Sequence, residues 1–187
     1  MTIEAAASVA LAVASDVPGI LELSNSAAEK SPANFATEPE PLSMWMRSWE
    51  ETNERYPWLV AKSDSELLGF AKASPHRSRG AYAWTAEVSV YVRGDLHGRR
   101  IGSLLYRHLI PLVREQGYMM LLAGITSPNP ASERLHAAFG FAYCGTFHRA
   151  GWKFGQWHDV AYWELQLQND GPPRAIRSVG EVWGAPR

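Results

Sequence analysis

The sequence has little of what several classes of protein require. Its single cysteine, Cys144, cannot form a disulfide within the chain. Its six histidines are scattered, without further histidine or cysteine at ligand spacing, so no metal site is expected. No apolar run approaches the roughly 18 residues of a membrane-spanning helix. The net charge of -1 offers no electrostatic footprint for nucleic acid or a membrane surface. These absences favour a cytoplasmic protein with a small or locally charged ligand.

The length of 187 residues fits one domain with a sizeable hydrophobic core. We expect this domain to span residues 1–168, and residues 169–187 to form a C-terminal extension with little order of its own. The first sixteen residues are apolar but lack the basic region of a signal peptide. They are expected to be a disordered start that runs into a strand.

Periodicity and turn signals predict an α/β protein with a mixed sheet. Asp16 and Asn129 stand where each can cap a helix with proline in the first turn, and Pro111 is expected to kink or loosen a third helix. The expected elements are, in chain order, a strand at 9–14, a helix from 17, a proline-rich loop at 31–41, a helix at 42–56, a hairpin at 56–74, a strand at 81–92, a helix from 101, a strand at 118–125, a helix from 130 to about 140, and strands at 142–149 and 160–167.

The stretch "VYVRGDLHGRRIGSLLY" at 90–106 joins a strand to a helix through a loop rich in glycine and arginine. Backbone N–H groups and the helix dipole at such a junction favour an anion such as phosphate. Arg99 and Arg100 can add charged hydrogen bonds. The lysine of a nucleotide-binding P-loop is absent. An ordinary loop whose glycines only turn the chain remains an alternative.

This stretch, followed by "SPNPASERLHAAFGF", resembles the acetyl-CoA-binding core of the GCN5-related N-acetyltransferases (GNAT). Their loop motif, Q/R-x-x-G-x-G/A, falls on His97, Arg100 and Gly102, of which only Gly102 matches strictly. Arg100 stands in place of a glycine, which would impair coenzyme A binding if a positive φ is required there. The resemblance implies cofactor contacts for Val90, Tyr91, Val92, Gly98, Arg99, Arg100, Ile101, Gly102, Ser103 and Asn129.

A wider resemblance covers roughly residues 9 to 168. The blocks "NFATEPEP", "NERYPWLVA", "AYAWTAEVSVYV", "RLHAAFGF" and "WHDVAYWELQL" are similar to the phosphinothricin N-acetyltransferase subfamily, whose members acetylate phosphinothricin or methionine sulfoximine. It implies a GNAT fold, with a mostly antiparallel sheet of about seven strands flanked by four helices. It also implies an N-acetyltransferase that uses acetyl-CoA as co-substrate and takes a small amine with an anionic group.

Acetyl transfer to an amine needs a base, stabilisation of an oxyanion and a proton for the departing thiolate. Glu87 interrupts an apolar strand, and alternation alone allows it to be a solvent-facing residue. The subfamily carries a glutamate at this place, which implies a general base. His136 stands where many GNAT enzymes have a tyrosine acid, although a lone helical histidine is more often structural.

The acceptor is expected to be chosen by residues before this strand. The resemblance implies substrate contacts for Arg77, Arg79 and Tyr82, because arginines bind anionic oxygens in bidentate fashion. Phe35, in a polar loop, is either a lid over a pocket or an anchor for the loop. The resemblance implies a wall or lid. Ala36 and Ala83 depart from residues found in some members, so a changed acceptor preference is also open.

Two alternatives stay open at this point. The chain could acetylate another amine, such as a protein N-terminus, a polyamine or a drug, or it could bind acyl-CoA without catalysis. A homodimer is suggested by the tryptophan-rich turn at 152–157 and by the habit of the family.

Overall fold

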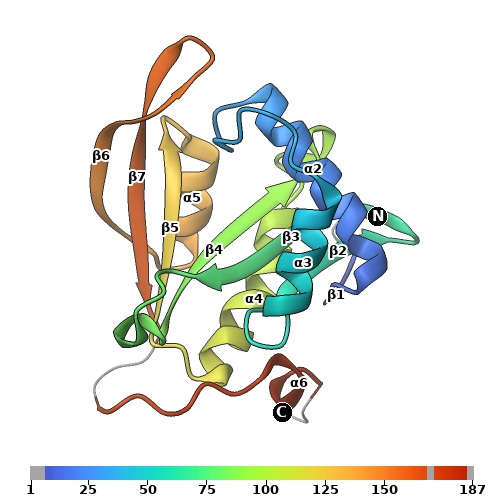
Figure 1. Cartoon of the computed structure of the whole chain (residues 1–187), viewed down its shortest axis with the longest axis vertical. Helices are drawn as coiled ribbons and strands as arrows, with labels where there is room; N and C mark the ends of the chain where they lie inside the picture. The colour runs from blue at the N-terminus through green and yellow to red at the C-terminus, as the bar shows by residue number, and fades with distance from the viewer. Residues whose placement is uncertain (1–6, 168–170, 185–187) are drawn as a thin grey trace.

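A seven-stranded sheet forms the centre of the computed structural model, which describes residues 7–167 and 171–184 (Figure 1). The strands are ordered β1-β2-β3-β4-β5-β7-β6, and the pair β4·β5 is parallel while the others are antiparallel. The strands are β1 (Ser8–Leu11), β2 (Trp58–Ser63), β3 (Glu66–Pro75), β4 (Thr85–Val92), β5 (Met120–Ser127), β6 (Ala142–Lys153) and β7 (Gln156–Gln166). The predicted mixed, mostly antiparallel sheet is confirmed.

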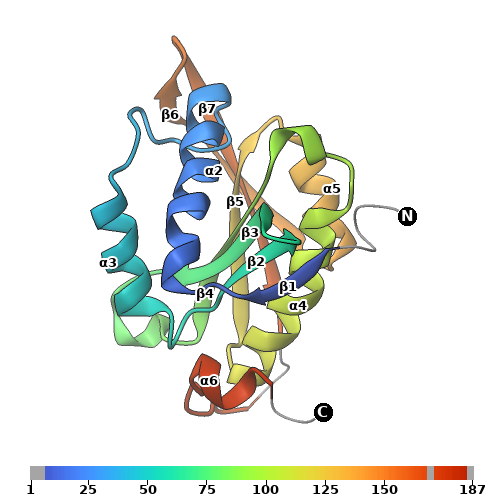
Figure 2. The same ribbon diagram turned by 90° about the vertical axis from the view of Figure 1, so that its right-hand side faces the viewer.

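Helices cover both faces of the sheet (Figure 2). They are α2 (Val17–Lys30), α3 (Leu42–Thr52), α4 (Ile101–Gln116), α5 (Pro130–Ala138) and α6 (Val179–Val182). Helices α2 and α3 lie on one face, where Trp45 packs edge-on against Trp58 and Phe70. Helices α4 and α5 lie on the other face, and Leu105 and Leu109 of α4 are fully buried there. The apolar helical spacing that the sequence shows therefore faces the sheet.

Of the two predicted caps, the one at Asn129 forms, whereas the Asp16 carboxylate makes no cap hydrogen bond to α2 and instead binds the Val13 N–H and Lys62 Nζ. Asn129 Oδ1 accepts a hydrogen bond from the Ser132 N–H at 3.2 Å, and Pro130 is the first residue of α5. Gly140, at a φ of 86°, ends the turn after this helix. Helix α4 continues through Pro111 and ends at Gln116, with Gly117 as the capping residue after it.

Two segments differ from the expectation. The strand predicted from residue 81 begins at Thr85, because Gly80–Tyr82 forms a 3-10 turn first. The C-terminal segment was expected to have little order, yet residues 171–184 pack against α4: Arg177 and Gln116 exchange hydrogen bonds, and Val179 is buried. The predicted N-terminal start falls partly on residues 1–6, outside the described residues.

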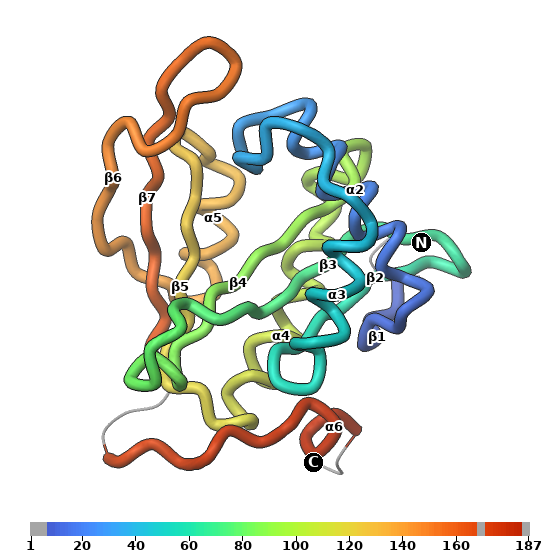
Figure 3. Tube along the Cα trace, viewed as in Figure 1, coloured from blue at the N-terminus to red at the C-terminus, as the bar shows by residue number. Residues whose placement is uncertain are grey.

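The tip of the β6–β7 hairpin lies beside the loop that joins α2 to α3 (Figure 3). Lys153, buried on β6, connects the two. Its Nζ donates hydrogen bonds to the carbonyl oxygens of Ala28, Asn34 and Ala36 at 2.6, 2.7 and 2.6 Å. This single side chain joins the last turn of α2 and two points of the loop that follows it to the hairpin.

Candidate active site

The sheet opens between β4 and β5. The two strands pair only over residues 85–87 and 120–122, whereas β4 stays paired with β3 to Val92 and β5 stays paired with β7 to Ser127. The Arg93 N–H donates to the Leu68 carbonyl on β3, so by alternation the N–H groups of Val90 and Val92 point towards β5. Beyond residue 87, an edge of β4 therefore faces an opening rather than a strand.

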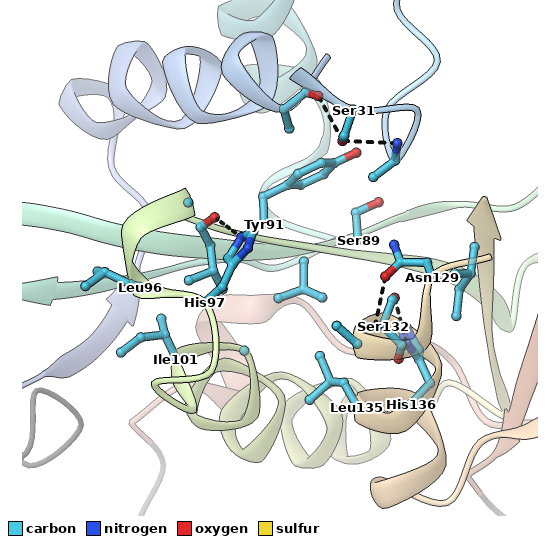
Figure 4. Close-up of a pocket in the computed structure, with 18 of the residues that line it drawn as sticks. Ser31, Ser89, Tyr91, Leu96, His97, Ile101, Asn129, Ser132, Leu135 and His136 are labelled. Atoms are coloured by element: carbon cyan, nitrogen blue, oxygen red, sulfur yellow. Dashed lines mark hydrogen bonds between the residues drawn. The ribbon is translucent and has the colours of Figure 1, made fainter. Parts of the chain in front are cut away.

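A cavity of about 1000 Å³ occupies this opening (Figure 4). Its walls come from the end of α2, the separated parts of β4 and β5, the loop before α4, and α5. The predicted cofactor residues that line it are Val90, Tyr91, Val92, Gly98, Arg100, Ile101, Gly102, Ser103 and Asn129. Arg99 is exposed and is not part of the wall, so the two arginines take different places.

The loop at the start of α4 presents an anion-binding backbone. Gly98 has a φ of 78° and Arg100 a φ of 62°, and Arg100 is the residue that precedes the helix. The first i to i−4 bond of α4 runs from the Leu104 N–H to the Arg100 carbonyl, which leaves the earlier N–H groups of the helix for a ligand. Arg100 itself therefore holds a left-handed conformation, at a cost of about 1–2 kcal/mol.

Glu87 lies at the point where β4 and β5 separate, since its pairing with Leu122 is the last between these strands. Its side chain is 41% exposed, and its Oε1 lies 2.7 Å from His76 Nδ1. The ring of Tyr82 stands edge-on to His76 at 5.3 Å, and the Arg77 guanidinium lies over Tyr82 at 5.6 Å. The structure thus brings Glu87, Tyr82 and Arg77 together through His76.

His76 was missed by the sequence analysis. It stands in the same segment as Arg77, and the hairpin register, with Ser74 opposite Glu87, places it near the glutamate. The proximity of His76 to Glu87 can be inferred only once the pairing register of β3 and β4 is known.

His136 and Tyr106 form a buried pair on the wall of the cavity. His136 Nδ1 lies 2.8 Å from the Ser132 carbonyl, which can only accept, so Nδ1 carries the proton. Nε2 therefore accepts from the Tyr106 hydroxyl at 2.9 Å. Burial lowers the pKa of His136 and raises the pKa of Tyr106, which keeps both neutral. In this arrangement the Tyr106 proton is directed at His136 Nε2 and the His136 proton at the Ser132 carbonyl.

The other predicted acceptor residues lie outside the cavity. Arg77 and Arg79 are exposed, and Arg79 has no side-chain partner among the described residues. Phe35 is 37% exposed and packs on the hairpin: a Cβ added at Gly151 would lie 2.4 Å from its ring. Of the two roles considered for Phe35, this contact is that of an anchor for the loop.

Within residues 7–167 and 171–184, no group of three or more His, Cys, Asp or Glu side chains could hold a metal ion. In the same part of the chain, none of the helices combines the length and the apolar character needed to cross a bilayer.

Comparisons with known proteins agree with this geometry. The family model for GNAT acetyltransferases matches residues 20–141. A phosphinothricin N-acetyltransferase of Streptomyces viridochromogenes is 39% identical over 171 residues, 91% of this chain and 93% of the relative. An L-methionine sulfoximine/L-methionine sulfone acetyltransferase of Pseudomonas aeruginosa is 37% identical over 164 residues, 86% of this chain and 95% of the relative.

Solved structures show the same likeness. The acetyltransferase yncA from Salmonella typhimurium, determined with its cofactor acetyl-CoA, has a TM-score of 0.87 at 31% identity and covers 91% of this chain and 99% of its own. A GNAT superfamily phosphinothricin acetyltransferase from Sinorhizobium meliloti, in complex with AcCoA, has a TM-score of 0.80 at 28% identity and covers 96% of each chain. The open sheet, the loop before α4 and these matches lead to one conclusion: the chain belongs to the GNAT family of acetyltransferases.

Proposed function

We propose that the protein transfers the acetyl group of acetyl-CoA to the amino group of a small, amino-acid-like acceptor, of the phosphinothricin or methionine sulfoximine type. The observation that carries this proposal is the place of Glu87, at the point where β4 and β5 separate and one residue before Val88, where the wall of the large cavity begins on β4. The names of the relatives from Streptomyces viridochromogenes and Pseudomonas aeruginosa support the acceptor class.

The cavity fits coenzyme A by its donors. The N–H groups that begin α4 and the guanidinium of Arg100 suit the phosphates, and the edge of β4 at Val90 and Val92 suits a pantetheine amide. Asn129 Oδ1 is used as a helix cap, which leaves its amide nitrogen, turned towards Ser89 in Figure 4, as a donor. When bound, acetyl-CoA supplies an activated thioester.

We assign Glu87 as the general base. The contact from His76 engages one carboxylate oxygen and leaves the other to take a proton from the ammonium of the acceptor. The amine then attacks the thioester carbonyl, and the Val90 N–H, aimed into the opening, can donate to the oxyanion. We assign the proton for the departing thiolate to the attacking nitrogen, which loses it as the tetrahedral intermediate collapses. The Tyr106 proton is hydrogen-bonded to His136 Nε2 and the His136 proton to the Ser132 carbonyl, so this pair forms part of the cavity wall.

Replacing the base tests this proposal directly. We expect Glu87→Gln to lower kcat by about 100-fold or more at neutral pH, with coenzyme A affinity unchanged. Thiol release measures the rate, and calorimetry measures the affinity. Glu50→Gln, an exposed glutamate on α3, is the matched control. A variant at Glu87 that keeps its rate would remove the residue from the mechanism.

The acceptor class needs a separate assay. Thiol release is measured with phosphinothricin, methionine sulfoximine, a polyamine and a peptide with a free N-terminus. Turnover of the two amino-acid analogues alone supports the proposal. Turnover of only the polyamine or the peptide would assign another amine, and coenzyme A binding without any turnover would indicate a non-catalytic protein.

We also propose a homodimer. Five exposed aromatic side chains gather on β6, which is an edge strand, on β7 beside it and on the turn that joins them; these are Tyr143, Phe147, Trp152, Phe154 and Trp157. An exposed edge strand that carries large apolar side chains favours pairing with another chain, and a second copy carries the same surface. Sedimentation at micromolar concentration should give twice the chain mass of 20.8 kDa; a monomer would contradict the proposal.

A further inference from the structure

A second, smaller cavity of about 350 Å³ adjoins the cofactor cavity. The two share Ser89 and Tyr91 of β4, and the smaller one lies on the face of the sheet covered by α2 and α3. Lys72 of β3 lies in its wall, directly opposite Ser89 in the strand register. Ser89 follows Glu87 by two residues, so both point to the same face, about 7 Å apart along the strand. The small cavity therefore begins one side-chain row away from the proposed base.

The ammonium of Lys72 is incompletely satisfied. It lies over the rings of Trp45 and Trp58, 4.7 and 4.2 Å from their centroids. Among the described residues, no acceptor lies within hydrogen-bond distance of its Nζ, although an ammonium has three donors. Burial lowers its pKa to about 8, against the attraction of Glu40. The nearby carboxylate of Glu40 accepts from Trp45 Nε1 through Oε2, and Lys72 is the cationic side chain in the wall of this cavity.

We propose that Lys72 binds an anionic oxygen at the end of the acceptor's side chain, and so selects α-amino acids with an acidic side chain. This inference rests on the proposed function, because it assumes that the amine lies at Glu87. An α-carboxylate is only two bonds from the amine and stays beside Glu87. A carboxylate or phosphinate at the end of the side chain reaches the next row of the sheet, where Lys72 stands.

Nothing else in the small cavity offers a full positive charge. The charged side chains in its wall are Lys72 and Glu40. Arg77 and Arg79, which the sequence suggests for this role, lie in the walls of neither cavity. The Arg77 guanidinium instead lies over the Tyr82 ring. Lys72 therefore takes the place of an anion-binding residue in the acceptor site.

The test compares two acceptors that share the amino-acid part and differ in side-chain charge. Phosphinothricin ends in an anionic phosphinate, and methionine sulfone ends in a neutral sulfone. The quantity compared is kcat/KM for phosphinothricin divided by kcat/KM for methionine sulfone. In this ratio the titration of the shared amine and of Glu87 cancels. We expect Lys72→Met to lower this ratio by about 10- to 100-fold, as for loss of a hydrogen bond to a charged group. Lys72→Arg, which keeps the charge, should retain part of the preference.

The pH dependence gives a second readout. In the wild type the ratio should fall as pH rises through about 8, because Lys72 loses its charge there. In Lys72→Met the ratio should not change with pH. Equal losses for both acceptors, or a ratio unchanged by the variant, would overturn the role of Lys72 while the acetyltransferase assignment stands. If the wild type turns over neither acceptor, the proposed function fails and this inference fails with it. Coenzyme A affinity, measured on each variant, shows that the fold is intact.

Discussion

Lys72 and Lys153 are two lysines withdrawn from bulk water, and they differ in what their ammonium groups contact. Burial lowers the pKa of both. Lys153 donates to three carbonyl oxygens at 2.6–2.7 Å, whereas Lys72 lies over two indole rings and beside an open cavity. A buried charge with a complete set of acceptors joins parts of the fold, while one without them marks a place for a ligand. The difference predicts opposite effects for the same substitution.

The largest expected effect is on stability at Lys153. Lys153→Met removes three charge-assisted hydrogen bonds and leaves the carbonyls of Ala28, Asn34 and Ala36 without this donor. We expect a loss of about 3 kcal/mol, which lowers Tm by roughly 6–12 °C for a chain of this size. Lys72→Met leaves no acceptor unpaired, so its Tm should be unchanged or higher. Thermal unfolding of both variants measures the two changes in Tm. Equal losses of Tm would contradict the difference proposed between the two lysines.

A smaller loss of stability is expected from displacing Phe35, which lies in the loop between α2 and α3 that Lys153 contacts. Gly151→Ala places a Cβ 2.4 Å from the Phe35 ring, which must shift. We expect a loss of about 1–3 kcal/mol, as for other overpacked sites. The control is Gly180→Ala, because a Cβ at Gly180 would meet nothing within 4 Å. If the two alanine variants unfold at the same temperature, the loop is not anchored by this contact.

The smallest effect concerns a third cation, Arg100, which has a strained backbone and lines the cofactor cavity. Arg100→Gly relieves the positive φ but frees the unfolded chain, so the net gain should be about 0.5–1 kcal/mol. Coenzyme A affinity should fall by about 10-fold if the guanidinium meets a phosphate. Thermal unfolding measures the change in stability, and calorimetric titration measures the change in coenzyme A affinity. An affinity that stays the same would make Arg100 a tolerated substitution, without a role in binding.

Local signals in the sequence were sufficient for most of the elements. Asn129 with Pro130 caps a helix through contacts within four residues, and the apolar face of α4 follows from its spacing alone. The opening between β4 and β5 depends on how far two strands distant in sequence stay paired, which no local pattern records. The packing of the C-terminal segment depends likewise on Gln116, a distant side chain.

The candidate site was predicted in the same uneven way. The cofactor loop is contiguous in sequence, and all its predicted residues except Arg99 line the cavity. The acceptor side is assembled from separate elements. Lys72 stands within "LLGFAKAS", where a lysine is typical of a strand residue that faces solvent. Only the covering by α3, which places Trp45 over the ammonium, encloses it.

The opening of the sheet has a consequence for isotope exchange. In β4 the N–H groups of Ser89 and Tyr91 point to β3, while those of Val90 and Val92 point into the cavity and have no strand partner. Deuterium should therefore replace hydrogen quickly at every second residue along one strand of an otherwise protected sheet. Occupation of the cavity by coenzyme A should slow exchange at Val90 and Val92 more than at their neighbours. The exchange rates of these individual amides would then report the binding of coenzyme A.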